Sequence, residues 1–236
     1  MRLRSYISKC WPRSWGYLPH KLWDLHLGRR LINRGIRIKM RRQGYHLLGG
    51  KQQANRNGVF DIYHHPGRKE IIKIPRRDDY YSYYFWDSLR DASQYEKYRK
   101  ILLNACQQAH IGEHVVAVNE VFRSGGYISP YIDGFLLADL GYSLDSALVP
   151  VQDVLDALDD LECSLTVCVG VGMPLSGDWE LHNLLFDPGE RRIINVDVEG
   201  FYSFAPGRRE NQLNRICQNI EDVRRLLLKL SGTQER

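Results

Sequence analysis

The 236-residue sequence lacks the features that mark several common classes of protein. Its five cysteines are scattered, with no Cys-x-x-Cys pair and no histidine spacing suited to zinc, which argues against a disulfide framework or a metal cluster. The uncharged runs near the N-terminus are far shorter than the roughly 18 residues of a membrane span, and no signal-peptide core follows the first arginines. The scattered cysteines suit a reducing, cytosolic environment, and the short uncharged runs predict no transmembrane segment. Because 43% of the residues are apolar, we expect a globular protein with a real core.

Positive charge is concentrated at one end of the chain. Residues 1–44 hold twelve Lys or Arg and a single acid, Asp24, for a net charge of +11; since the whole chain sums to +5, the remainder carries −6. Tryptophan and tyrosine rings are interleaved with these cations, a pattern typical of surfaces that meet anionic lipid headgroups. Nucleic acid accepts the same pattern but is the less favoured partner, and a solvated basic helix is the ordinary alternative.

The sequence contains no internal repeats, so its organisation is read from periodicity and turn residues. From Tyr45 onward, the segments YHLLGG, GVFDIYHH and EIIKIP are separated by turn residues, which predicts a three-stranded meander. Helical spacing of apolar residues follows in 85–106, and two more strands are expected in 113–123 and 125–134.

The second half of the chain has a different pattern. Long amphipathic helices are predicted after Pro150 and between Ile216 and Leu230, and LLF and RRIINVDV, joined by the turn DPGE, predict a β-hairpin between them. This order predicts a two-lobed α+β fold. After an arm of residues 1–44 we expect a β-rich N-lobe with one helix at 45–132 and a compact, mostly helical C-lobe at 133–236.

Three oxygen-bearing side chains flank the predicted hairpin. Asp178 and Asn183 precede its first strand and Asp197 ends its second, so the hairpin should bring them to one side. Asp197 and the amide oxygen of Asn183 suit a hard cation such as Mg²⁺, while Asp178 remains available as a base. For an isolated Asp or Asn, capping of a turn is the commoner role.

The Asp-x-x-x-x-Asn spacing in GDWELHN, followed by an apolar run, a turn and NVDVEG, resembles the catalytic loop and metal-binding Asp of the protein-kinase-like superfamily. The SGD triplet, the YIDG segment and the small size make the chain most similar to lipopolysaccharide core heptose kinases and related bacterial sugar and aminoglycoside phosphotransferases. This resemblance, which extends from about Tyr45 to Leu230, implies ATP and Mg²⁺ as cofactors and a sugar or glycolipid hydroxyl as the acceptor. Together with the basic residues 1–44, it predicts a cytoplasmic protein that is peripheral at the inner membrane.

The resemblance also implies roles for individual residues. Lys73 in EIIKI takes the position of the phosphate-contacting lysine, with Glu96 as its carboxylate partner and Asp91 as the alternative. Asp178 would accept the proton of the acceptor hydroxyl, and Asn183 and Asp197 would hold Mg²⁺.

The same resemblance also implies which residues bind the nucleotide. Gly49 and Gly50 are what remains of a glycine-rich loop, although a Gly-Gly pair is also an ordinary turn. Ser129 and Tyr131 would line the adenine pocket, where backbone groups read the base.

Several features keep other interpretations open. A lysine flanked by isoleucines, such as Lys73, is commonly a surface residue, and Glu96 can pair with Lys100 along one helix face. Glu180 stands where related small-molecule kinases often have His. The alternative is therefore a catalytically silent kinase-like scaffold that docks on a membrane or partner through its basic arm.

Overall fold

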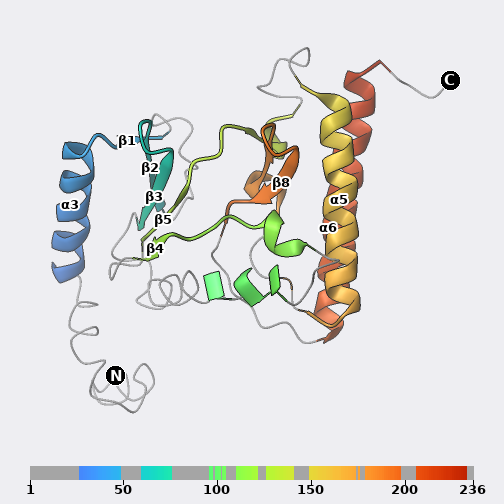
Figure 1. Cartoon of the computed structure of the whole chain (residues 1–236), viewed down its shortest axis with the longest axis horizontal. Helices are drawn as coiled ribbons and strands as arrows, with labels where there is room; N and C mark the ends of the chain where they lie inside the picture. Colours follow the sequence, from blue (N-terminus) through green and yellow to red (C-terminus); the bar gives the residue numbers. More distant parts are fainter. Residues whose placement is uncertain are drawn as a thin grey trace, which may run out of the picture.

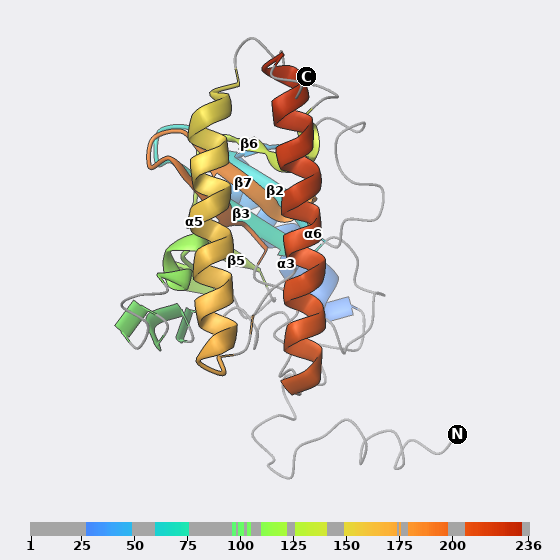
Figure 2. The same cartoon turned by 90° about the vertical axis from the view of Figure 1, so that its right-hand side faces the viewer.

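The computed structural model describes residues 27–48, 60–75, 96–104 without 98 and 102, 110–121, 126–140, 149–173, 175, 179–197 and 206–232. These residues form the expected two-lobed α+β fold, with a β-rich lobe and a lobe dominated by two long helices, which overlap in Figure 1 and lie side by side in Figure 2. No helix among them combines the length and the apolarity that crossing a bilayer requires.

A five-stranded antiparallel sheet forms the N-lobe. The meander predicted from the sequence is present as β1 (His46–Leu47), β2 (Phe60–His65) and β3 (Glu70–Pro75). Strands β5 (Tyr127–Pro130) and β4 (Glu120–Val121) complete the sheet in the order β1-β2-β3-β5-β4. The strand β3 that carries Lys73 is therefore the central strand.

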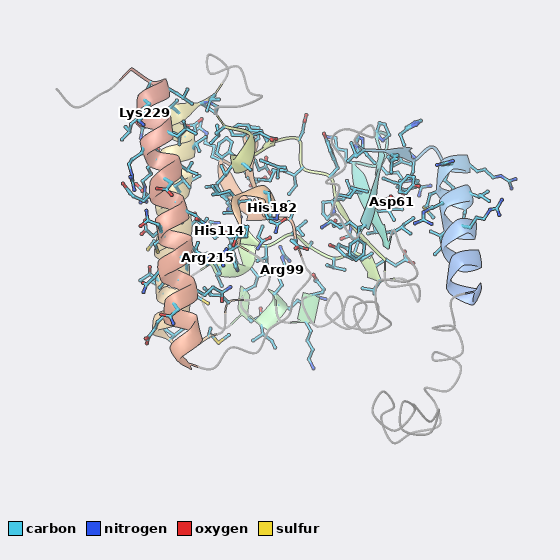
Figure 3. All side chains as sticks on the ribbon, turned by 180° about the vertical axis from the view of Figure 1, so that it is seen from behind. Asp61, Arg99, His114, His182, Arg215 and Lys229 are labelled. Carbon is cyan, nitrogen blue, oxygen red and sulfur yellow. The ribbon has the colours of Figure 1, made fainter. Side chains whose placement is uncertain are left out.

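The two faces of this sheet have different neighbours, because side chains alternate along each strand. One face carries the small core of the N-lobe, which consists of Met40, Tyr45, Tyr63, Ile72 and Ile74. Helix α3 (Leu27–Arg42) packs on this face through Met40, and its Arg37 pairs at 3.0 Å with Asp61 of β2. Figure 3 labels Asp61 in the N-lobe sheet. Lys73 lies between Ile72 and Ile74 in the strand, so its side chain emerges from the opposite face.

Helix α3 lies within the segment predicted as a basic arm. Because Ile36 and Met40 pack with the sheet, the end of the arm is joined to the N-lobe. Residues 1–26 lie outside the described residues, and the lobe boundaries at 44 and 132 stay predictions.

The C-lobe is built on the two helices that the sequence predicted, α5 (Val151–Gly170) and α6 (Pro206–Leu230), which run antiparallel (Figure 2). Helix α6 begins ten residues before the expected start at Ile216. They pack against a sheet of β6 (Phe135–Leu136), β7 (Leu184–Asp187) and β8 (Arg192–Asn195), of which β7 and β8 form the predicted hairpin. The fully buried side chains shared by these elements include Val154, Leu158, Leu161, Leu165, Leu184, Phe186, Ile193, Ile220 and Leu227. Each stabilises the fold by about 1.5–3 kcal/mol relative to an exposed side chain.

The strand expected over 113–123 is only partly correct. A 3-10 turn, η2 (Ile111–His114), occupies its first residues, and of the described residues 113–121 only Glu120 and Val121 form a strand of the N-lobe sheet. Between them, Val115 bridges to Asn195 of β8, and Val115 and Val116 are buried in the core of the C-lobe. These valines therefore have the composition of a strand, but they pack across the two lobes and do not form one.

Two glycines allow close approaches that hold the lobes in place. A Cβ at Gly112 would lie 2.8 Å from Cγ of Leu103, so this position lets the helical residues of 96–104 pack against η2. A Cβ at Gly134 would overlap the carbonyl oxygen of Phe186 in β7. Gly134 ends the connection between β5 and β6, which leads from the N-lobe sheet to the C-lobe sheet.

Candidate active site

Lys73 is directed from the N-lobe sheet toward the C-lobe. The residue is 8% exposed; its Nζ donates a hydrogen bond to the carbonyl oxygen of Val196 at 3.1 Å and lies 3.8 Å from Oδ1 of Asp197. The ring of Tyr127, which is opposite Lys73 in the β3–β5 register, has its centroid 5.5 Å from Nζ. The alternative of a surface lysine is therefore wrong, since this ammonium group joins the two lobes.

The ion pair between Lys73 and Asp197 is largely shielded from water. The two side chains are 10% and 16% exposed, so their attraction is screened less than that of a surface pair. Removing one partner of such a pair leaves the other charge uncompensated, which typically costs about 3–5 kcal/mol.

Asn195 positions Asp197. Its side-chain oxygen Oδ1 accepts a hydrogen bond from the backbone N–H of Asp197 at 2.9 Å, and its backbone oxygen accepts one from Val116 at 2.9 Å. Asn195 is fully buried at the end of β8. Sequence analysis missed this residue, although its signal was a polar side chain two residues after Ile193, at an inward-facing position of an apolar strand.

Asn183 lies beside the same segment. Its carbonyl oxygen accepts a hydrogen bond from the N–H of Val196 at 2.8 Å, and the β7–β8 register pairs Leu184 with Asn195. The hairpin therefore brings Asn183 and Asp197 to the same end of the C-lobe sheet. A carboxylate and a carboxamide are hard oxygen donors, so this donor set fits Mg²⁺, which takes its other ligands from water and phosphate.

Glu96 and Lys73 are both described by the structure, and none of their contacts joins one side chain to the other. Its Oε2 accepts a hydrogen bond from the N–H of Val118 at 3.2 Å, and its Oε1 lies 3.7 Å from Nζ of Lys100. The contact with Lys100 is the helix-face pair that sequence analysis had left open. The role of Glu96 as partner of Lys73 stays a prediction.

Ser129 and Tyr131 lie along β5 and just beyond it. Ser129 is 1% exposed and opposite Ile71, on the same face of the sheet as Lys73. The N–H of Tyr131 donates to the carbonyl oxygen of Lys69 at 2.7 Å, and its ring centroid lies 4.0 Å from that of His64. Because that N–H is engaged, an adenine base would have to bind other backbone groups of 131–134.

Three predicted site residues, Gly49, Gly50 and Asp178, lie outside the described residues, as does the alternative Asp91. The nearest described neighbours of Asp178 in sequence, Leu175 and Trp179, are buried in the C-lobe core. The following residue, Glu180, forms an ion pair with Arg215 of α6. Figure 3 labels Arg215 on this helix and His182 in the 3-10 turn Leu181–Asn183 that precedes β7.

Comparisons with known proteins give a coarse result. No protein-family model matches the chain, and neither does any curated protein. The PknI kinase domain of Mycobacterium tuberculosis, as a double mutant, is 19% identical with a TM-score of 0.35, over 68% of this chain and 63% of that domain. The Rio2 kinase of Chaetomium thermophilum, in a complex with ADP, Mg²⁺ and phosphoaspartate, is 17% identical with a TM-score of 0.45, over 85% of this chain and 70% of that one.

The chain thus spans slightly less than two thirds of the PknI kinase domain. At these identities and TM-scores, an argument about function has to rest on the residues of this chain.

Proposed function

We propose that this protein is an ATP-dependent phosphotransferase with an alcohol as acceptor. The observation that carries the proposal is the contact of Lys73 with Asp197 at 3.8 Å, which joins the central strand of one lobe to the end of the β7–β8 hairpin in the other. A shielded cation that faces a carboxylate and a neighbouring carboxamide suits the binding of a triphosphate together with its metal ion.

The roles of the residues follow from this arrangement and from the resemblance to kinases. Lys73 binds the α and β phosphates, and Asn183 and Asp197 provide oxygen ligands for Mg²⁺. When bound, Mg²⁺ would neutralise charge on the transferred phosphoryl group. Asp178 accepts the proton of the acceptor hydroxyl, whose oxygen bonds to the γ-phosphorus while the bond to the bridging oxygen breaks and ADP leaves.

We further propose that the acceptor is a sugar or a glycolipid at the cytoplasmic side of a membrane. The support is the resemblance of SGDWELHN and YIDG to small bacterial sugar kinases, together with the basic segment 1–44. The acceptor has to be identified by experiment, because the fold does not determine it.

The test is transfer of labelled phosphate from ATP to sugars and extracted glycolipids in the presence of Mg²⁺. We expect transfer to fall by roughly 10²-fold or more in Asp197→Ala, because a metal ligand is lost. Asp222→Ala, at an exposed position of α6, is the matched control and should be fully active. Equal transfer by both variants would remove the proposal.

A second candidate function is a scaffold that docks on an anionic membrane, and the surface of α3 and β1 favours it. Exposed cations at the end of α3, Lys39, Arg41 and Arg42, lie near Ile38 and Leu47, whose side chains are 44% and 47% exposed. No acidic residue occurs from 25 to 60. Cations beside exposed apolar side chains are typical of an interfacial helix.

Two measurements separate the candidates. Binding of ATP and Mg²⁺ at a hundred times the dissociation constant should stabilise the enzyme by roughly 2.7 kcal/mol, whereas a silent scaffold shows no thermal shift. Docking predicts sedimentation with phosphatidylglycerol vesicles but not with phosphatidylcholine vesicles. It should be lost when Lys39, Arg41 and Arg42 are changed to Gln, and retained when Arg225 and Lys229 of α6 are changed instead.

A further inference from the structure

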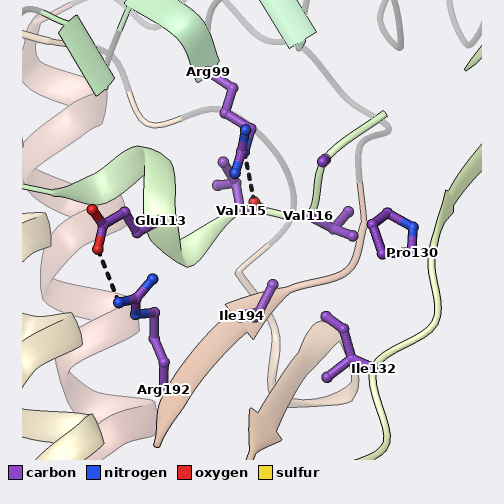
Figure 4. A pocket seen from close by; sticks show the side chains of 9 residues that line it. Arg99, Glu113, Val115, Val116, Pro130, Ile132, Arg192 and Ile194 are labelled. Atoms are coloured by element: carbon purple, nitrogen blue, oxygen red, sulfur yellow. Dashed lines mark hydrogen bonds and ion pairs between the residues drawn. The ribbon is translucent and has the colours of Figure 1, made fainter. Parts of the chain in front are cut away.

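A pocket of about 350 Å³ is lined by none of the residues assigned to phosphate transfer (Figure 4). Its walls come from the segment before β4, from the end of β5 and the connection that follows, and from β8. Six of its nine lining residues are apolar: Val115, Val116, Ala117, Pro130, Ile132 and Ile194. Its volume is at the lower end of the range for small-molecule sites, roughly 300–1,000 Å³, so its size suits a small molecule.

Two of the three charged lining residues neutralise each other. Nη2 of Arg192 lies 3.0 Å from Oε2 of Glu113, and the other carboxylate oxygen of Glu113 lies 3.3 Å from Nδ1 of His110. This pair forms one end of the pocket in Figure 4. It leaves Arg99 as the source of a net positive charge in the lining.

Arg99 has hydrogen-bond donors to spare. Its Nε donates to the carbonyl oxygen of Val115 at 3.0 Å, which fixes the guanidinium group beside the apolar wall. Its two terminal amino groups have no partner among the described residues. An arginine held in this way presents two parallel N–H groups, the geometry that binds a carboxylate or a phosphate through two hydrogen bonds.

We propose that this pocket binds a small amphiphilic anion. Its apolar body would lie against Val116, Ile132 and Ile194, and its single carboxylate or phosphate monoester group would pair with Arg99. An apolar wall with one convergent charged group is the usual composition of such a site. Arg99 is on the same helical segment as Glu96, and β8 leads into Asp197, so the ligand would contact segments that also carry predicted site residues.

The experiment measures binding to the full-length protein by calorimetry, with octanoate, octyl phosphate and the neutral octanamide as probes. The inference does not depend on the proposed function, because no nucleotide is present. We expect saturable one-site binding of at least one anion. The affinity should be at least tenfold lower for octanamide and for the Arg99→Gln variant.

Two further variants make the result specific to the pocket. Ala117→Leu fills the apolar part while leaving Arg99 in place, so it should abolish binding even if Arg99→Gln folds poorly. Arg191→Gln is the matched control, since Arg191 is an exposed arginine outside the lining that pairs with Asp153. It should bind like the unchanged protein. The proposal is overturned if neither anion binds saturably, if octanamide binds equally well, or if Ala117→Leu retains full affinity.

Discussion

The two lobes hold their parts of the candidate site with very different amounts of core. Among the described residues, the C-lobe cluster includes α5, α6, β7 and β8, whereas the N-lobe cluster has only five buried members. Asn183 and Asp197 therefore lie on the more extensively packed lobe, and Lys73 lies on the lobe with the smaller core. We therefore expect the position of Lys73 relative to Asp197 to depend mainly on the N-lobe sheet and on the contacts of Lys73 with Val196 and Asp197.

The largest expected effect is on activity and concerns the cation that the N-lobe contributes. In Lys73→Ala, phosphate transfer should fall by roughly 10²–10³-fold, because the charge that faces the phosphates is removed. The measurement is transfer of labelled phosphate from ATP, with Lys229→Ala on α6 as the control. Similar rates for the two variants would mean that the N-lobe supplies no charge to the reaction.

The next effect compares the two cores directly. Leu161→Ala in α5 and Ile72→Ala in β3 each create a cavity at a fully buried site and should cost about 2–5 kcal/mol locally. We expect Leu161→Ala to lower the urea midpoint of the whole chain. Ile72→Ala should instead accelerate hydrogen exchange mainly in 60–75. If Ile72→Ala speeds exchange equally in 60–75 and 151–170, the lobes do not differ as proposed.

A smaller effect is expected for the residue that positions Asp197. Asn195→Ala removes the acceptor for the N–H of Asp197 and leaves that donor without its hydrogen bond, which costs about 1–3 kcal/mol. Because Asn195 acts through Asp197, the Mg²⁺ concentration for half-maximal activity should rise. A variant that is merely less stable would lose activity with an unchanged Mg²⁺ dependence.

The contact between the lobes should also give a modest pH dependence. Burial is the main cause of the lowered pKa of His114. The contact of its Nδ1 with the carbonyl oxygen of Ile193 at 2.8 Å raises the pKa, as do the charges of Asp160 and Glu113, whereas Arg192 lowers it. Folding therefore favours the neutral ring. As the pH falls below about 6.5, the unfolded state binds the proton first, so the free energy of unfolding should decrease.

Urea unfolding between pH 7.5 and 5.5 measures this dependence. In His114→Gln, the part of the decrease that belongs to this histidine should disappear. An identical pH dependence in the variant would assign it to other groups.

The smallest expected effect concerns the attachment of α3. The pair between Arg37 and Asp61 is partly exposed, at 24% and 18%, so Arg37→Ala should cost only about 0.2–1 kcal/mol. Thermal unfolding with and without 0.5 M salt tests this, since screening should reduce the difference between the variant and the unchanged protein. A loss of several kcal/mol would mean that α3 contributes more to the N-lobe than its few core contacts suggest.

Local patterns predicted the elements whose stability depends on a single amphipathic face or a turn. Helices α5 and α6, the β2–β3 meander and the β7–β8 hairpin follow from periodicity and turn residues. The hairpin explains why Asn183 and Asp197 lie at the same end of the C-lobe sheet. The strand expected over 113–123 was only partly right, because Val115 and Val116 bury their side chains in the other lobe.

The sequence by itself determined the two-lobed order of strands and helices and the spacing of the oxygen-bearing residues. Both depend on residues that are close together in the sequence. Only the tertiary structure decided where the ammonium group of Lys73 and the carboxylate of Glu96 go. Lys73 and Val196 are 123 residues apart in sequence. Their contact results from how two lobes pack, and no periodic pattern in either segment encodes that packing.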